Sequence, residues 1–304
     1  ASKAEGISAA DQGSLGQKVA VRVDAVTPQY QNAEAIMTVE SNQPGCLQDR
    51  VAIVTGGASG IGRATALLLA QQGAQVYVGD RELLSENDDL FAQQAITQIA
   101  CDIRSEADVQ KLVQQAAGQQ RIDILVNNAG APAGRDRTLV VDVEEDAWDL
   151  VQSVNVKGTF LCSQAVARTM IKRDLGGKII NLSSVAGKRG VARYAAYCTS
   201  KFAVRGFTQA LALELAPHAI TVNAICPVLV DTERVDDMAE ALKPDGTATT
   251  AYREELVSRT AMGVPLGRIA QPDDIARSAA FLASAEADYL TGLSLSVSGG
   301  YVMD

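Results

Sequence analysis

The sequence predicts an α/β fold with a central parallel sheet flanked by helices on both faces, and three observations support it. Its 304 residues are 47% hydrophobic and 21% charged, which suits a globular domain with a substantial core. Short runs of β-branched residues alternate with longer segments that have the apolar spacing of helices. A glycine-rich turn at 56–62 joins the first such run to the first helical segment. A single doubly wound domain of the Rossmann type is therefore the expected architecture.

The elements follow one another in the order that a parallel sheet requires. Val51–Thr55 is a compact β-branched run, and Arg63–Gln72 has helical spacing and ends at Gly73. The alternation continues along the chain, because parallel strands are joined by crossover helices. Further strands are expected at Gln75–Gly79, Ile96–Cys101, Ile122–Val126, Lys178–Leu182, Thr221–Ile225 and Leu293–Val297. Further helices are expected at Glu106–Ala117, Trp148–Arg173, Ala195–Ala216 and Pro272–Leu282, and within Thr232–Met262.

Residues 1–45 differ from the rest of the chain and are interpreted as an N-terminal extension. They mix Gly, Gln, Asn and Ser with one aromatic residue, Tyr30, and the alternating valines of 19–23 are compatible with a short strand. We expect a loosely packed arm; the alternative is an oligomer contact. Residues 46–304 form the predicted catalytic domain, which is expected to bind both cofactor and substrate.

Charge and composition exclude several classes of partner. The chain has 27 Lys and Arg against 36 Asp and Glu, a net charge of −9 that repels phosphate backbones and anionic lipids, so neither nucleic acid nor membrane is an expected partner. No window approaches the roughly 18 apolar residues of a membrane-spanning helix. The five cysteines lack CxxC spacing, which predicts reduced thiols and no metal site. We see no targeting signal in residues 1–25 and expect a cytoplasmic protein.

The glycine-rich turn predicts a site for a dinucleotide pyrophosphate. Glycines let the backbone turn sharply and approach the anion, and the amino end of the following helix faces it. Asp80 stands 18 residues after Gly62, where a carboxylate accepts hydrogen bonds from a ribose diol and repels a ribose phosphate; we therefore predict NAD rather than NADP. The adjacent Arg81 leaves NADP open, because its cation would neutralise a phosphate. The residues assigned to the cofactor on this basis are Gly56, Ser59, Gly60, Ile61, Gly62, Asp80 and Arg81.

Four further motifs occur in order after this TGxxxGxG turn. They are Asn127-Asn128-Ala129-Gly130, Asn155 in Val-Asn-Val, Ser184 at the end of Asn-Leu-Ser-Ser, and Tyr197 with Lys201 in Tyr-Cys-Thr-Ser-Lys. In this order and spacing the chain resembles the short-chain dehydrogenase/reductase family over about Leu47–Val302. The resemblance implies an NAD(P)-dependent oxidoreductase acting on CH–OH groups. It also implies a catalytic tetrad of Asn155, Ser184, Tyr197 and Lys201.

The resemblance implies further cofactor contacts and an assembly. The residues that match the family's cofactor-binding positions are Asp102 and Ile103 at the adenine, Asn128, Ala129 and Gly130 at the adenosine side, Tyr197 and Lys201 at the nicotinamide ribose, and Pro227, Val230 and Thr232 at the nicotinamide. Val228 stands where the family usually has glycine, so we expect a smaller substrate pocket or a differently set following loop. A homotetramer formed through the helices at Trp148–Arg173 and Ala195–Ala216 is implied as well.

The chemistry of these residue types supports the same assignment. Tyr197 and Lys201 lie at i and i+4 on one face of a helix, so the ammonium can stabilise a phenolate whose unperturbed pKa is about 10. Tyr197 is therefore the predicted acid/base, and Ser184 the predicted donor to the substrate oxygen. In the family Lys201 also holds the nicotinamide ribose, and Asn155 positions a water that relays the proton.

We predict an NAD-dependent dehydrogenase that reversibly oxidises a secondary alcohol, such as a polyol, sugar or hydroxy compound. The alternatives are an NADPH-dependent carbonyl or 3-oxoacyl carrier-protein reductase, and a nucleotide-sensing scaffold without turnover. Arg189 and Arg193 lie between the serine and tyrosine motifs. We expect them to be part of a solvated loop; the alternative is a cation that attracts a carboxylate or sulfonate.

Overall fold

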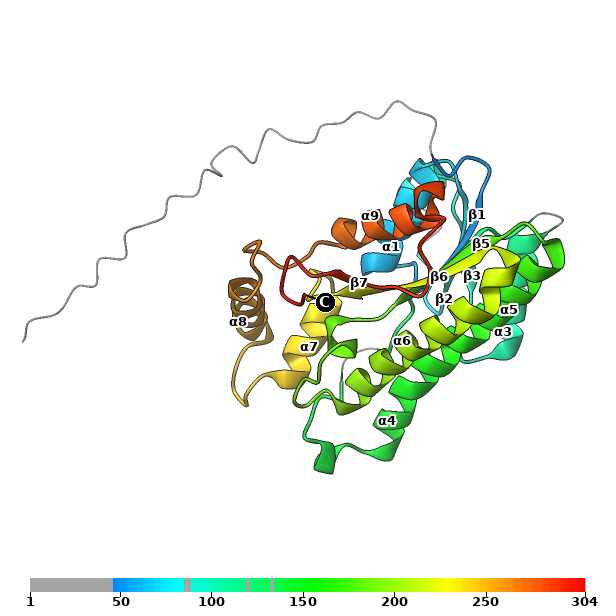
Figure 1. Ribbon diagram of the computed structural model, residues 1–304. Helices are drawn as coiled ribbons and strands as arrows, with labels where there is room; N and C mark the ends of the chain where they lie inside the picture. Colours follow the sequence, from blue (N-terminus) through cyan, green and yellow to red (C-terminus); the bar gives the residue numbers. More distant parts are fainter. Residues whose placement is uncertain (1–45, 85–88, 119–120, 132–133, 304) are drawn as a thin grey trace, which may run out of the picture. The chain divides into compact units, whose positions relative to one another are not determined.

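The computed structural model describes residues 46–303 except 85–88, 119–120 and 132–133. Its sheet has seven strands in the order β3-β2-β1-β4-β5-β6-β7, and every neighbouring pair is parallel. The doubly wound parallel fold is thus confirmed (Figure 1). The strands are β1 (Val51–Thr55), β2 (Gln75–Asp80), β3 (Thr97–Ala100), β4 (Ile124–Asn127), β5 (Gly177–Leu182), β6 (Ile220–Pro227) and β7 (Ser294–Val297).

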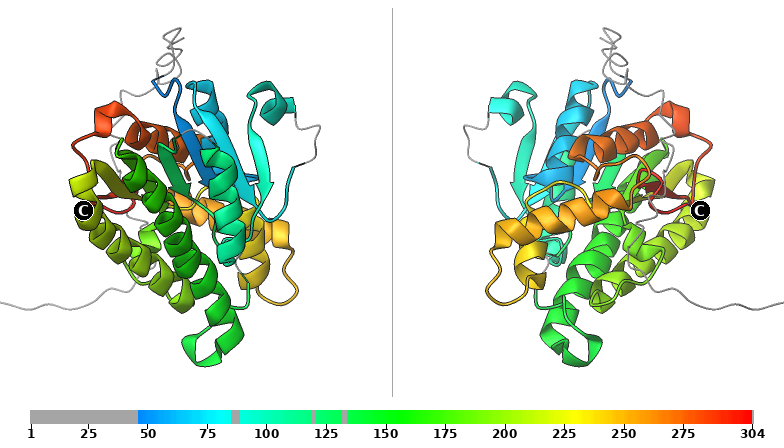
Figure 2. Two further views of the ribbon diagram at one scale, coloured as in Figure 1. Left: turned by 90° about the vertical axis from the view of Figure 1, so that its right-hand side faces the viewer. Right: turned by 90° about the vertical axis from the view of Figure 1, so that its left-hand side faces the viewer.

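Helices cover both faces of the sheet (Figure 2), because successive residues of each strand point to opposite sides. Ala52 and Val54 of β1 pack with α1 and α9, whereas Ile53 between them packs with α3, α5 and α6 on the other face. The helices are α1 (Gly60–Gln71), α2 (Asp89–Gln93), α3 (Glu106–Ala117), α4 (Glu145–Gln152), α5 (Thr159–Arg173), α6 (Ala195–Leu215), α7 (Arg234–Leu242), α8 (Thr249–Met262) and α9 (Pro272–Ala283).

Three expectations about the elements need correction. The helix expected over Trp148–Arg173 is interrupted: α4 and α5 are separated by a π-helical turn, η3 (Ser153–Gly158). Within it, the Asn155 side chain is bound to groups on two other segments, which local apolar spacing does not reveal. The first helix begins at Gly60 instead of Arg63, and the short helix α2 was not expected. The segment 19–23, whose alternation is compatible with a short strand, and the rest of the arm lie outside the described residues.

The loops at the carboxyl ends of the strands carry the elements that matter for function. Chain connections leave β1 and β4 in opposite directions along the sheet, which makes a topological switch point between these two strands. The segment after β6 forms α7 and α8 near this edge (Figure 1). In open α/β sheets a ligand binds in the crevice that this arrangement leaves. Within the described part of the chain, no helix has both the length and the apolarity to cross a membrane.

Candidate active site

A cavity of about 580 Å³ lies at the carboxyl end of the sheet. Its walls come from the loops after β4, β5 and β6 and from α6, α7 and α8, so segments distant in sequence meet there. Residues predicted to bind cofactor and residues predicted to be catalytic both line it, which places the two groups in one site. The predicted residues lining the cavity are Ile61, Asn128, Gly130, Ser184, Tyr197, Lys201, Pro227, Val230 and Thr232.

The turn between β1 and α1 has the geometry of an anion cradle. Gly56 has a positive φ of 63°, and a Cβ atom at Gly62 would lie 1.9 Å from the carbonyl oxygen of Gly56, so only glycine fits there. The amino end of α1 has no acidic residue in its first turn, and the Ser59 side chain makes no capping hydrogen bond within the described structure. The helix's first N–H groups are therefore available to a phosphate, and the residues present fit a dinucleotide cofactor.

The Asn128 segment holds this turn in place. Asn128 Nδ2 donates to the carbonyl oxygens of Thr55 at 3.1 Å and Gly56 at 2.7 Å. In return, Thr55 Oγ1 accepts the backbone N–H groups of Asn128 and Ala129 at 3.1 and 3.2 Å. Thr232 reaches the turn from the segment after β6, because a methyl group at Gly60 would lie 3.1 Å from its Cγ2. The predicted phosphate, adenosine and nicotinamide contacts are thus neighbours.

Asp80 lies at the end of β2, beside the phosphate turn. Its Oδ2 accepts the backbone N–H of Ala58 at 3.0 Å, while Arg81 is exposed. Asp102 is engaged by Arg104, whose guanidinium Nε donates to both carboxylate oxygens at 3.0 Å and holds the pKa of Asp102 below its usual range. Ile103 is buried in the core, where it packs close to Gly158.

Tyr197 and Lys201 lie one turn apart on α6 and face the cavity. Lys201 is 6% exposed, its Nζ donates to the carbonyl oxygen of Leu182 at 2.7 Å, and it lies 5.6 Å from the centroid of the Tyr197 ring. Burial raises the pKa of the Tyr197 phenol, but the charges of Lys201, Arg234 and Arg137 and a hydrogen bond with Ser184 outweigh burial, so the pKa lies below its ordinary value. Burial lowers the pKa of Lys201.

Ser184 lies two residues after the end of β5 and beside Tyr197. Its Oγ accepts the backbone N–H of Ala186 at 3.1 Å as the cap of the short 3-10 turn η4 (Val185–Gly187). Because the oxygen is used as an acceptor there, the hydroxyl hydrogen remains available to Tyr197 or to a substrate oxygen.

Asn155 is placed behind the cavity and is 1% exposed. Its Oδ1 accepts the backbone N–H of Ala131 at 2.8 Å, and its Nδ2 donates to Ser200 Oγ at 2.9 Å. Ser200 in turn donates to the carbonyl oxygen of Tyr197 at 2.7 Å. The side-chain amide therefore connects the loop after β4 to the turn of α6 that carries the tyrosine.

The backbone after β6 has ordinary geometry at Val228. Its φ is not positive, its N–H donates to the carbonyl oxygen of Val297 at 3.3 Å, and its side chain joins the hydrophobic core while lining the cavity. Its branched side chain thus forms part of this wall of the cavity.

Two cavity residues were not identified from the sequence: Arg137 and Arg234. Arg137 lies in the loop after β4, is 4% exposed, and its Cζ is 4.4 Å from the Tyr197 ring centroid. Arg234 begins α7, and its Cζ is 5.7 Å from the same ring. No local motif marks either residue, since both reach the site through long-range packing. Arg189, expected from the sequence in a solvated loop, is exposed, lines the cavity and lies over the ring of Tyr301.

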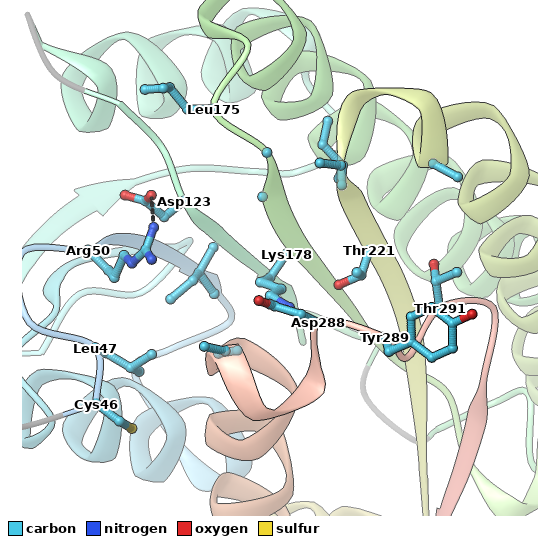
Figure 3. A pocket seen from close by; sticks show the side chains of 18 residues that line it. Cys46, Leu47, Arg50, Asp123, Leu175, Lys178, Thr221, Asp288, Tyr289 and Thr291 are labelled. Atoms are coloured by element: carbon cyan, nitrogen blue, oxygen red, sulfur yellow. Dashed lines mark hydrogen bonds and ion pairs between the residues drawn. The ribbon is translucent and has the colours of Figure 1, made fainter.

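A second cavity, of about 650 Å³, opens at the opposite, amino end of the sheet (Figure 3). Its charged side chains are paired: Lys178 Nζ lies 2.6 Å from Asp288 Oδ1, and Arg50 Nη1 lies 3.1 Å from Asp123 Oδ1. Ligands of parallel α/β sheets bind at the carboxyl ends of the strands, so its larger volume does not make it the candidate site.

Comparisons with known proteins agree with the geometry. Residues 56–302 match the family model described as enoyl-(acyl carrier protein) reductase. The chain is 43% identical over 261 residues to the short-chain reductase protein NovJ of Streptomyces niveus, covering 83% of this chain and 94% of that protein. It is 38% identical to a sorbitol dehydrogenase of Cereibacter sphaeroides, covering 84% of this chain and 98% of that protein.

A solved structure shows the same similarity in three dimensions. The ligand-free aldohexose dehydrogenase of Thermoplasma acidophilum superposes with a TM-score of 0.75 at 32% identity, covering 85% of this chain and 96% of that chain. The sequence motifs, the parallel sheet with its site and these similarities agree. The chain belongs to the short-chain dehydrogenase/reductase family.

Proposed function

We propose that this oxidoreductase is an NAD-preferring dehydrogenase that reversibly oxidises a secondary alcohol to a ketone. The observation that carries the proposal is the Tyr197 phenol, which has a lowered pKa and a serine hydroxyl beside it in a cavity next to the phosphate turn. Relatives named sorbitol dehydrogenase and galactitol 2-dehydrogenase support a polyol, sugar or hydroxy compound as substrate.

The cofactor would be held along the turn before α1 and the neighbouring loops. We propose that the N–H groups at the amino end of α1 bind its pyrophosphate, Asp80 its adenosine ribose, Lys201 its nicotinamide ribose and Thr232 its nicotinamide. When bound, the nicotinamide supplies hydride acceptance and donation.

The chain's own residues would handle the proton and the orientation of the substrate. In the oxidation direction, the Tyr197 phenolate takes the proton of the substrate hydroxyl, while Ser184 donates a hydrogen bond to the same oxygen. Lys201 keeps the phenolate charged. The side-chain amide of Asn155 is hydrogen-bonded to Ala131 and Ser200. We therefore propose that Asn155 acts by positioning the turn of α6 that carries Tyr197. A water that relays the proton would bind to Asn155 outside its side-chain amide.

The choice of NAD rests on Asp80. Its carboxylate lies 3.0 Å from the Ala58 nitrogen, at the place where a ribose phosphate would bring a second negative charge. A 3-oxoacyl carrier-protein reductase using NADPH is the second candidate, favoured by the exposed Arg81 next to Asp80 and by a relative from Thermotoga maritima that carries this name. Replacement of Asp80 by alanine is expected to reduce the preference for NAD over NADP; an unchanged ratio of kcat/KM for the two would remove Asp80 from this role.

The proposed activity is tested by reduction of NAD and of NADP across polyols, sugars, hydroxy acids and simple secondary alcohols. Tyr197→Phe is expected to lower kcat by about 10²- to 10⁴-fold while NADH still binds. Tyr289→Phe is the matched control, because this fully exposed tyrosine lies at the amino-end cavity. Full activity of Tyr197→Phe would refute the assigned base, and cofactor binding without turnover of any substrate would favour a nucleotide-sensing role.

We further propose a homotetramer built through α5 and α6. These helices expose large apolar side chains, with Phe160 at 41%, Phe202 at 45% and Leu213 at 80% exposure. Light scattering of the purified protein tests the assembly: a mass of one or two chains would contradict it.

A further inference from the structure

The active-site cavity has a positive charge that the chain as a whole does not have. The chain contains 36 Asp and Glu against 27 Lys and Arg, yet none of the described residues that line this cavity is an aspartate or glutamate. The cations that line it are Arg137, Arg189, Arg193, Lys201, Arg234 and Arg259. Such a cavity raises the local concentration of anions and disfavours cationic ligands.

Three of these arginines lie exposed at the edge of the cavity, where water screens them. Arg259 pairs with Glu255 of the same helix at 3.7 Å, and Arg189 lies 4.4 Å from the ring centroid of Tyr301. Arg193 is exposed in the loop before α6. Surface cations of this kind steer ligands without fixing them. Specific recognition therefore depends on the cations inside, Arg137 and Arg234.

Arg137 is buried with unused hydrogen-bond donors. Its guanidinium lies against two aromatic rings, with Cζ 4.1 Å from the centroid of Tyr194 and 4.4 Å from that of Tyr197. Its Nε and Nη1 have no hydrogen-bond partner among the described residues. The nearest carboxylate, Asp136 Oδ2, is 3.5 Å from Nε without forming a hydrogen bond, and Asp136 Oδ1 already accepts the N–H of Gly134.

A second cation lies beside the same tyrosine. Arg234, at the start of α7, donates to the carbonyl oxygen of Ala131 and lies 5.7 Å from the Tyr197 ring centroid. Burial and the charge of Arg234 both lower the pKa of Arg137, while Asp136 offsets part of this effect. Arg137 is buried and Arg234 half-buried beside the same ring, so an anion that contacts both guanidinium groups would stabilise the pair.

We propose that this anion is a carboxylate of the substrate, so that the enzyme acts on a small hydroxy acid and its keto acid. The inference rests on the function proposed above and specifies its substrate. The guanidinium of Arg137 offers a planar fork that matches the two oxygens of a carboxylate. Because Arg137 lies on the ring of Tyr197 itself, the carboxylate belongs within one or two carbons of the hydroxyl-bearing carbon.

The reaction leaves the carboxylate unchanged. The carbon that bears the hydroxyl loses its hydrogen as hydride to the oxidised nicotinamide, and the hydroxyl proton passes to the Tyr197 phenolate and then to water. A keto acid, one reduced cofactor and one proton result. The cavity of about 580 Å³ must also admit the nicotinamide, which restricts the acid to a short chain.

The substrate is tested with matched pairs: 2- and 3-hydroxy acids of three to six carbons, the corresponding amides, and glycerol phosphates as a second type of anion. We expect kcat/KM to favour the acid over its amide by about 100-fold, in line with loss of a buried charge-assisted contact. Equal or better turnover of the amides or of uncharged polyols would overturn the hydroxy-acid proposal and leave the dehydrogenase intact. Preference for the phosphates would overturn the carboxylate assignment.

Two variants test Arg137 directly. Arg137→Met, which keeps the volume of the apolar stem and removes the guanidinium, is expected to lower kcat/KM for the acid by about 100-fold while changing that for the amide much less. Arg137→Lys retains the charge but loses the planar fork, and should recover part of the activity toward the acid. Arg135→Met is the control, because Arg135 is exposed in the same loop and pairs with Glu144 and Asp146. An unchanged ratio of acid to amide in Arg137→Met would refute the role of this residue.

A binding measurement separates this proposal from the proposed activity. Calorimetry in saturating NADH is performed with propionate, butyrate and succinate and with their amides, on the wild type and on Arg137→Met. Binding of the carboxylates, but not of the amides, to the wild type, and of neither to Arg137→Met, would support the anion site even if no alcohol were oxidised. Absence of carboxylate binding to the wild type would refute it, whatever the enzyme oxidises. Thermal unfolding of each variant identifies any loss that comes from misfolding.

Discussion

A chain of buried amides fastens the catalytic helix to the sheet, and breaking it is expected to destabilise the protein by a calculable amount. Asn181 on β5 is 0% exposed; its Oδ1 accepts from Asn127 Nδ2 at 2.8 Å, and its Nδ2 donates to Thr208 Oγ1 on α6 at 2.9 Å. Asn181→Leu has nearly the same shape and removes both hydrogen bonds at once.

The partners left behind determine the magnitude. Asn127 Nδ2 retains its bond to Ser163 at 2.9 Å, and Thr208 still donates to the carbonyl oxygen of Val204. One amide hydrogen therefore stays buried without a partner, which costs about 1–3 kcal/mol, and the second lost hydrogen bond adds about 1 kcal/mol. The free energy of unfolding is expected to fall by about 3 kcal/mol. With an m-value of about 3 kcal/mol/M, the midpoint of urea unfolding moves down by about 1 M.

The assay is urea unfolding at one protein concentration, followed by turnover below the transition. Because α6 carries both Tyr197 and Lys201, kcat is expected to fall more than the binding of the cofactor. Thr221→Val is the matched control on the neighbouring strand: the Thr221 hydroxyl is buried without a hydrogen-bond partner among the described residues, so its removal should leave stability unchanged or slightly raised. Wild-type stability of Asn181→Leu would refute this account of the amide chain.

Two further predictions concern the cofactor turn and the base. Gly62→Ala is expected to weaken NADH binding by about tenfold or more, because its Cβ would lie 1.9 Å from the carbonyl oxygen of Gly56. Gly206→Ala, with open space around it on α6, should retain binding and gain up to about 1 kcal/mol of stability. Tighter NADH binding by Gly62→Ala than by Gly206→Ala in a titration would contradict this prediction. The cations around Tyr197 lower its pKa, so alcohol oxidation should rise with pH through an apparent pKa below that of a free phenol. Arg234→Gln removes one cation and should move this rise to higher pH; a pH–rate profile that does not move would exclude Arg234 from tuning the base.

The parts of the fold that local sequence determines were predicted well. The β-branched run at Val51–Thr55 matches β1, and Glu106–Ala117 matches α3. A strand buried on both faces leaves a continuous apolar run in the sequence, and a helix packed on one face leaves a periodic one. The π-helical turn at Ser153–Gly158 was not predicted. The apolar spacing of this turn continues that of α4 and α5, so the sequence indicates one unbroken helix. The helix is interrupted where the Asn155 side chain bonds to Ala131 and Ser200 on other segments.

The candidate site divides in a similar way. Tyr197 and Lys201 are four residues apart on one helix, so their proximity follows from the sequence alone. Arg137 is 60 residues away, in a polar loop that reads as solvated, and only the packing of that loop against α6 makes it 4% exposed. The residues that perform the chemistry are thus carried by regular elements whose patterns are local. The residue proposed to select the substrate comes from a loop, and its burial depends on contacts that no window of sequence contains.

The two inner arginines connect substrate choice to the chemistry of the base. Arg137 and Arg234 both lower the pKa of Tyr197, which favours the phenolate needed for oxidation. A carboxylate bound between them would neutralise part of this field, so the phenol would hold its proton more firmly when an acid is bound than when the site holds a neutral alcohol. Lys201, which is 6% exposed behind the ring, keeps its influence in either case. Recognition of an acid by arginines at this position therefore requires a lysine that stabilises the phenolate independently, and α6 supplies one a single helical turn away.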